Sequence, residues 1–72
     1  MARLNTQQRE HIYEIVRSSI SYDIRVKARI ILAWNRKIKS YLIANSFDKT
    51  PDFVETVIND FKQNGIDAIT TK

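Results

Sequence analysis

Apolar residues recur along this chain at intervals of three and four, the spacing of helices that bury one face. The chain contains one glycine and one proline, so the residues that usually separate strands are nearly absent. We therefore predict an all-α fold, a small bundle of about four helices. Their expected bounds are 6–19, 22–36, 39–47 and 50–64.

The first two predicted helices differ in how much of their surface is apolar. The helix at 6–19 has a single stripe, made of Ile12, Ile15 and Val16. The helix at 22–36 has two apolar arcs. One arc holds Ile24, Ala28, Ile31, Leu32 and Ile38, and the other holds Val26, Ile30, Ala33 and Trp34. A helix that is apolar on two sides is predicted to lie at the centre of its bundle.

Residues that favour helix ends lie where the periodicity starts and stops. Asn5 or Thr6 can cap the first helix, and Asn5 and Gln8 have the spacing of a capping box. Thr50 can cap the last long helix, and Pro51 suits its first position. Gly65 can supply a left-handed residue that ends this helix. These signals support the predicted bounds.

The end of the chain carries a weaker pattern. Ile66 can fold back on the last long helix, and we expect the segment from Ala68 to Lys72 to fray or to continue into a further part. The predicted organisation is therefore one domain at 1–69 and a short polar tail at 70–72.

Charge is distributed unevenly along the 72 residues, whose net charge is +4. Residues 1–39 contain nine basic and three acidic side chains, whereas residues 40–72 contain three basic and five acidic ones. The basic half favours a polyanionic partner. Cysteine is absent, which excludes disulfides and thiolate zinc sites, and no secretory or membrane-spanning pattern is present. We expect a soluble cytoplasmic protein.

The helices at 39–47 and 50–64 are joined by about three residues, which is the arrangement of a helix-turn-helix. Ala44 is small enough for two helices to cross closely, and Val54 is placed to make the first core contact of the second helix. Phe47 and Val57 complete this contact. Any small bundle can bring two such helices together, so the spacing alone leaves DNA binding and simple packing both open.

Four segments between Leu4 and Ile69 carry a further likeness: LNTQQREHIYEIVRSS, RVKARIILAW, YLIANSFDKTPDFVETVINDF and FKQNGIDAI. They resemble, without a gap, the N-terminal helix-turn-helix domain of bacterial insertion-sequence transposases related to the mariner group. The residues in register with the family's spacing are Ile43, Ala44, Thr50 and Val54. The resemblance implies a homeodomain-like fold that binds transposon-end DNA, with catalysis in a separate domain. We expect this chain by itself to be no enzyme and to need no cofactor.

The sequence departs from the family at two turns and on the expected recognition helix. Lys37 and Asp48 stand where the family has glycine. The outward face of the helix at 50–64 carries acids, Asn and Thr in place of Arg and Lys. Asn suits adenine and a carboxylate can accept from cytosine, so this face could still read bases. The base-reading candidates are Asp52, Glu55, Thr56 and Asn59.

Backbone contacts are expected mainly from the basic stretch that precedes this helix. Such groups bind phosphates and give affinity that falls with salt. The candidates are Arg25, Lys27, Arg29, Arg36, Lys37, Lys39, Ser40, Tyr41 and Thr50. The alternative is a degenerate helix-turn-helix whose acidic helix docks a protein partner or a second copy. The acids lack the spacing of a metal site, and His11 lacks a catalytic partner in sequence, so we predict no metal and no catalytic residue.

Overall fold

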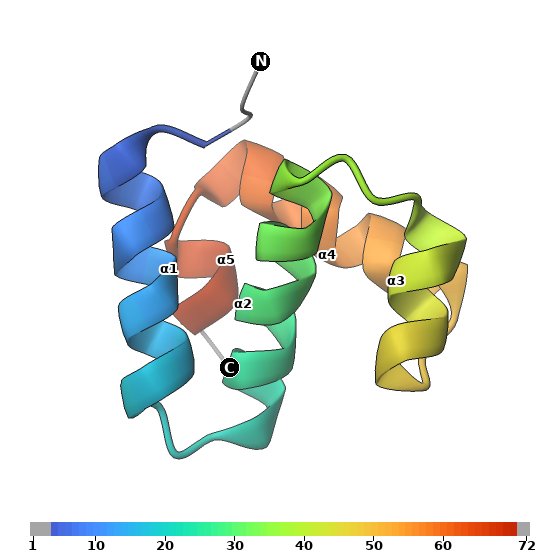
Figure 1. Ribbon diagram of the computed structural model, residues 1–72, viewed down its shortest axis with the longest axis horizontal. Coiled ribbons are helices and arrows are strands. Elements are labelled where there is room, and N and C mark those ends of the chain that lie inside the picture. Colours follow the sequence, from blue (N-terminus) through green and yellow to red (C-terminus); the bar gives the residue numbers. More distant parts are fainter. Residues whose placement is uncertain (1–3, 71–72) are drawn as a thin grey trace.

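A computed structural model describes residues 4–70 of the chain. This part is all-helical, with α1 at Thr6–Ser18, α2 at Tyr22–Asn35, α3 at Ser40–Phe47, α4 at Pro51–Asn64 and α5 at Asp67–Thr70 (Figure 1). The four predicted helices are confirmed, and each differs from its predicted bounds by one residue at one end. No helix in this part is long and apolar enough to cross a membrane.

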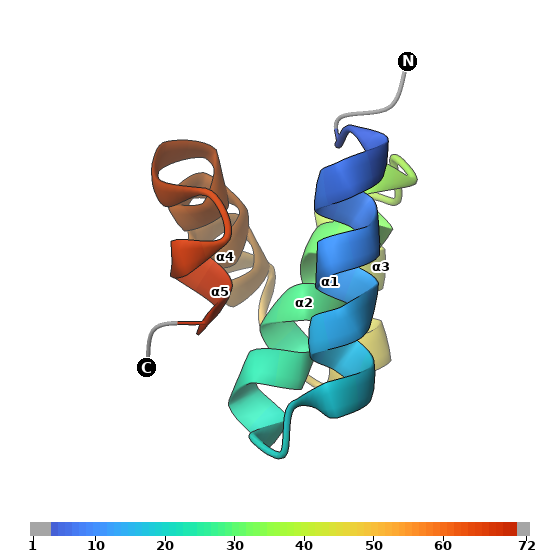
Figure 2. The same ribbon diagram turned by 90° about the vertical axis from the view of Figure 1, so that its left-hand side faces the viewer.

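α2 is the central helix of the bundle. It contacts α1, α3, α4 and α5. In Figure 1, α2 lies between α1 and α3. Figure 2 shows α4 and α5 to the left of α2, as a second layer that lies behind α2 in the view of Figure 1. The two apolar arcs fit this position, because a helix with neighbours on several sides buries more than one face.

The core is formed by one side of α1 and of α4, by both arcs of α2, by two residues of α3, and by Leu4 and Ile69. Its buried members are Leu4, Ile12, Ile15, Val26, Ala28, Ile30, Ile31, Ile43, Ala44, Val54, Val57, Ile58, Phe61 and Ile69. Ala44 and Val54 are both buried, as the predicted helix crossing requires. The edge of Trp34 meets the Phe61 ring with centroids 6.1 Å apart, which joins α2 to α4.

Two predicted caps are confirmed at helix starts. The Asn5 side chain accepts a hydrogen bond from the Gln8 N–H at 2.7 Å, and the Gln8 side chain accepts one from the Asn5 N–H at 3.2 Å. This is a complete capping box. At the start of α4, Thr50 Oγ1 accepts from the Phe53 N–H at 3.1 Å. Each cap satisfies a backbone donor that has no partner within its helix.

α2 and α3 end in the same backbone motif. Lys37 and Asp48 have positive φ angles of 65° and 58°, at the two positions where glycine was expected from the family resemblance. Each motif is closed by two bonds of the Schellman type. The bonds, donor first, join Lys37 to Trp34 (2.9 Å), Ile38 to Ala33 (3.3 Å), Asp48 to Asn45 (3.3 Å) and Lys49 to Ala44 (2.9 Å). The left-handed residue reverses the chain sharply, so α3 begins close to the end of α2.

One predicted core residue lies outside the core because of this reversal. Ile38 was assigned to the same arc as Ile31, but it is 39% exposed. The helical periodicity stops at Lys37, whose positive φ turns the following residue away from the α2 surface. The assignment of Ile38 to the core is therefore wrong.

Of the two alternatives expected from Ala68 onward, fraying or continuation into a further part, fraying is wrong for residues 68–70. Gly65 ends α4 with φ 65° and ψ −142°, a combination that glycine reaches easily. The chain then forms α5, and the side chain of Ile69 is fully buried. Burial of Ile69 against the core holds this last turn in place. Of the predicted tail at 70–72, Thr70 is the last residue of α5, and the other two residues lie outside the described part.

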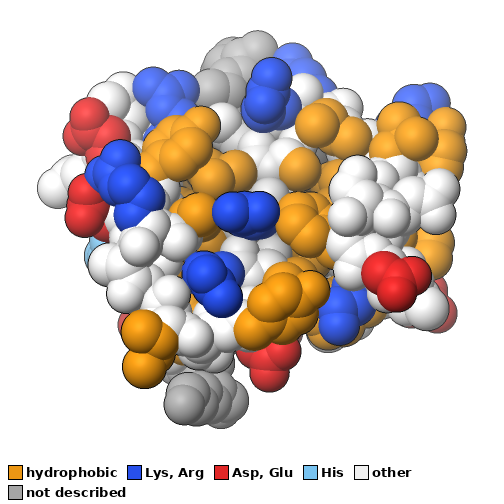
Figure 3. Space-filling model, turned by 60° about the horizontal axis from the view of Figure 1, so that its bottom comes forward, with side chains coloured by type: hydrophobic (Ala, Val, Ile, Leu, Met, Phe, Trp, Pro, Cys, Tyr) orange, Lys and Arg blue, Asp and Glu red, His pale blue; other side chains and the backbone are white. Residues whose placement is uncertain are grey.

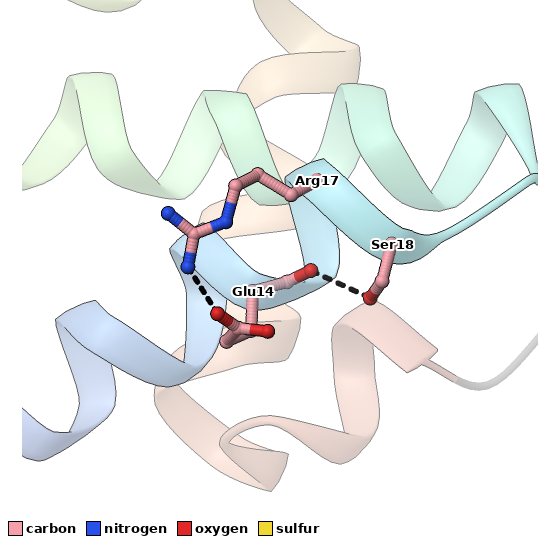
Figure 4. Close-up of polar contacts among 3 residues, drawn as sticks. All are labelled: Glu14, Arg17 and Ser18. Carbon is pink, nitrogen blue, oxygen red and sulfur yellow. Dashed lines mark hydrogen bonds and ion pairs between the residues drawn. The ribbon is translucent and has the colours of Figure 1, made fainter.

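The outer side of α1 is polar and its end is held by local contacts. Arg17 pairs with Glu14, and the Ser18 hydroxyl donates to the Glu14 carbonyl at 2.6 Å (Figure 4). Beyond this end, Ile20 is 98% exposed in the link to α2. The link therefore contributes nothing to the core at this position.

Candidate nucleic-acid interface

The outward side of α4 is polar and open to solvent. Its opposite side buries Val54, Val57, Ile58 and Phe61 in the core. A helix that buries this stripe must turn positions 52, 56 and 59 outward. All four base-reading candidates, Asp52, Glu55, Thr56 and Asn59, are exposed. An exposed α-helix face of this kind has the width to enter a major groove.

Glu55 lies at the edge of this face and contacts the start of α3. The Ser40 hydroxyl donates a hydrogen bond to the Glu55 carboxylate. Ser40 was predicted to contact phosphate and Glu55 to read bases, so the structure brings together two predicted site residues. The bond fixes where this carboxylate lies, beside the first turn of α3.

A groove of about 290 Å³ surrounds this hydrogen bond. It runs from the end of α2 across the start of α3 to the middle of α4, and its lining contains three lysines and one carboxylate. The lining residues are Trp34, Lys37, Ile38, Lys39, Ser40, Glu55, Ile58 and Lys62. Three lysines beside the polar face of α4 give this edge of the α3 and α4 pair a positive charge.

Lys62 is a member of this groove that the sequence analysis missed. Its ammonium group lies 5.7 Å from the centre of the Trp34 ring, a cation–π distance. A signal was present, because Lys62 follows Glu55 by seven residues and therefore lies on nearly the same side of α4. The prediction considered basic residues before the recognition helix and overlooked the one within it.

The start of α3 offers two more of the predicted contacts. Lys39 occupies the cap position and makes no side-chain cap hydrogen bond. Tyr41, in the first turn, is 56% exposed. The predicted backbone contacts Lys37, Lys39, Ser40 and Tyr41 are therefore clustered around the start of α3, and the first three line a groove with α4.

The arginines of α2 lie elsewhere. Arg25 and Arg29 line a separate groove of about 200 Å³ with Tyr22, Val26 and Phe47, between α2 and the end of α3. Arg36, at the end of α2, is exposed. Figure 3 shows a row of Lys and Arg side chains along the middle of one side of the molecule, with apolar side chains on both flanks. The structure thus separates the basic residues that sequence reasoning grouped together.

Lys27 belongs to a third groove, at the start of α2. This groove has a volume of about 350 Å³. Its lining includes Lys49, from the turn before α4, and Phe53, from the first turn of α4. The Lys49 ammonium group lies 5.2 Å from the centre of the Phe53 ring. Thr50 is exposed but uses its hydroxyl oxygen as the α4 cap. These residues flank the entry to α4 on the side opposite Ser40.

Across residues 4–70, the lysines and arginines of the candidate interface form no ion pair, although the Glu55 carboxylate lies in the lysine groove. The one ion pair of the described residues joins Glu14 and Arg17 on α1. In the same part of the chain, no cluster of three or more His, Cys, Asp or Glu could hold a metal ion. The lysines of the α3 and α4 groove and the arginines of α2 are therefore available to an anionic ligand.

Comparison of the chain with protein-family models, with curated proteins and with solved structures found no match.

Proposed function

We propose that this protein binds duplex DNA, with α4 facing the major groove and the groove between α3 and α4 against the phosphate backbone. The observation that carries the proposal is the open polar face of α4, bordered on one side by Lys37, Lys39 and Lys62. Base edges are read by polar side chains, and lysines bind phosphates as point charges.

The residues of α4 have distinct proposed roles. Asn59 and Thr56 offer donors and acceptors to base edges, and Asp52 can accept from the amino group of cytosine. Glu55 is held by Ser40 and lies nearer the backbone-binding groove. The positive φ angles of Lys37 and Asp48 also support the proposal, because they occur where the transposase-like pattern has glycine. Acting alone, the chain is proposed to bind and not to catalyse.

The test is a titration of the protein against fluorescent duplex of random sequence, followed by anisotropy between 50 and 200 mM salt. The logarithm of the binding constant should fall linearly with the logarithm of salt concentration. Each phosphate contact makes this slope steeper by about 0.9, so removal of a contact makes it shallower by the same amount. The variant Lys39→Ala/Lys62→Ala should lower the slope by about 1–2.

The matched control is Arg9→Ala/Arg17→Ala, which removes the same charge from α1. This variant should bind with nearly the wild-type slope. A binding constant that does not change with salt concentration would contradict the proposal. So would an equal reduction of the slope in both double variants.

A second candidate function, association with another protein chain, is favoured by α3. This helix contains no charged residue, yet Tyr41 and Leu42 are 56% and 46% exposed. Lys39 precedes it and Asp48 follows it. Two copies packed antiparallel along α3 would place each Lys39 near the partner's Asp48. Sedimentation equilibrium tests this function: a dimer that Leu42→Arg dissociates supports it, and a monomer at millimolar concentration excludes it.

A further inference from the structure

The two basic groups of the protein face in opposite directions. On α2, Lys27 and Trp34 lie on the side of α4, because each lines a groove with α4 residues. Successive residues of a helix are about 100° apart, so the stripe through positions 25, 29 and 36 lies about 160–220° away from these two. The stripe therefore faces away from α4. We refer to Arg25, Arg29 and Arg36 as the arginine face.

A single straight duplex cannot contact both surfaces. The polar face of α4 points away from α2, since the opposite side of α4 is buried against the core. Figures 1 and 2 show α2 and α4 in separate layers. The shortest dimension of the molecule is 20 Å. A duplex that lies along α4 is thus separated from the arginine face by the thickness of the protein.

The arginine face has the spacing of a binding surface for an extended polyanion. Arg25 and Arg29 are one turn apart, and Arg36 follows two turns later, so the row extends over about 16 Å of helix. Guanidinium groups fit phosphate oxygens in a bidentate manner. Arg25 Nε is buried without a hydrogen-bond partner, and the neighbouring Tyr22 is 62% exposed, which adds a hydroxyl at the same groove.

We propose that the arginine face binds the phosphate backbone of a second duplex, so that one protein molecule bridges two DNA segments on opposite sides. This inference rests on the proposed function for the first duplex, at α4. Duplex DNA carries one negative charge per about 1.7 Å of its axis, so a backbone can engage all three arginines at once. An acidic peptide is the competing ligand, and the experiment separates the two.

The experiment mixes the full chain at 50 mM salt with two duplexes of the same length, one biotinylated and one fluorescent, and measures how much fluorescent DNA is retained on streptavidin. Wild-type protein should retain it, whereas Arg29→Ala/Arg36→Ala should retain less than a tenth as much. Both side chains are exposed, so this variant keeps the core intact. Its affinity for a single duplex should fall by less than about threefold, because α4 still binds.

Each alternative gives a different result. Lys39→Ala/Lys62→Ala should weaken both retention and single-duplex binding, since the first site is lost. If wild-type protein binds one duplex but retains none, the bridging inference fails and the proposed function stands; if it binds no duplex, both fail. Retention that survives Arg29→Ala/Arg36→Ala but is lost in Leu42→Arg would assign bridging to a dimer. Binding of polyglutamate that depends on Arg29 and Arg36, without bridging, would assign this face to an acidic peptide.

Discussion

The hydroxyl of Ser40, in the first turn of α3, donates a hydrogen bond to the carboxylate of Glu55 on α4. The bond holds a negative charge within the groove that also contains Lys37, Lys39 and Lys62. A carboxylate in that position repels phosphate and offsets part of the lysine charge. It therefore lowers the attraction that this edge would exert on DNA under the proposed function.

Replacement of Glu55 by Gln should strengthen binding to duplex of random sequence. Gln keeps an oxygen that can accept from Ser40 but removes the charge. We expect a gain of about two- to fivefold at 50 mM salt that shrinks at 200 mM, as screening reduces the repulsion. Fluorescence anisotropy measures it, with Glu10→Gln on α1 as the control that should change little. A loss of affinity in Glu55→Gln would instead identify this carboxylate as a contact to a base.

Replacement of Lys37 by Gly should stabilise the fold. Lys37 has a φ of 65°, where a side chain is strained and glycine is not. The expected gain in free energy of unfolding is about 0.5–1 kcal/mol, which corresponds to a rise in melting temperature of about 2–8 °C for a domain of this size.

The control for this prediction is Lys27→Gly. It removes the same charge inside α2, where φ is negative, so glycine relieves no strain and costs about 1 kcal/mol of helix stability. Thermal and urea unfolding should therefore rank the proteins as Lys37→Gly, wild type and Lys27→Gly. The opposite ranking of the two variants would show that Lys37 is not strained.

Truncation of Ile69 should destabilise the protein strongly. The side chain is fully buried in α5, and removal of its outer carbons leaves a cavity. Ile69→Ala is expected to lower the free energy of unfolding by about 2–4 kcal/mol. Ile20→Ala makes the same change at a side chain that is 98% exposed, and it should stay within about 0.5 kcal/mol of wild type. Equal stability of the two variants in urea unfolding would contradict the burial of α5.

The cap of α4 can be tested at Thr50. Thr50→Ala removes the oxygen that accepts from the Phe53 N–H, and it should lower the free energy of unfolding by about 1 kcal/mol. Thr50→Ser retains the oxygen and should remain close to wild type. Circular dichroism during urea unfolding compares the two, and an identical loss in both would show that the methyl group of Thr50, and not its hydroxyl, is what matters.

Local signals in the sequence predicted most of the helices. Pro51 behind Thr50 located the start of α4, and the pairing of Asn5 with Gln8 located the start of α1. The apolar periodicity of α2 indicated a central helix. These signals act within a few residues of each other, so they can be interpreted without knowing the rest of the fold.

The errors came from features that depend on three-dimensional contacts. The core assignment of Ile38 extended a helical period past Lys37, where a left-handed residue ends it. The segment from Ala68 was expected to fray, or to continue into a further part, because it lies near the end of the chain. A helix of four residues is not stable alone, and the burial of Ile69 stabilises α5.

The sequence predicted which residues belong to the candidate site better than it predicted where they lie on the surface. The sequence placed basic residues before α4, and helical spacing alone puts Lys27 and Arg29 on opposite sides of α2. Which of these sides faces α4 follows only from the packing of the helices. Lys62 was overlooked because it lies on α4 itself.

The contact of α2 with every other helix has a consequence for how the molecule opens. Opening of any other helix within residues 4–70 removes contacts with α2, so α2 is expected to be the last helix to open. Amide protons in the middle of α2 should therefore exchange with solvent through global unfolding, with a common free energy of exchange equal to the stability of the whole domain.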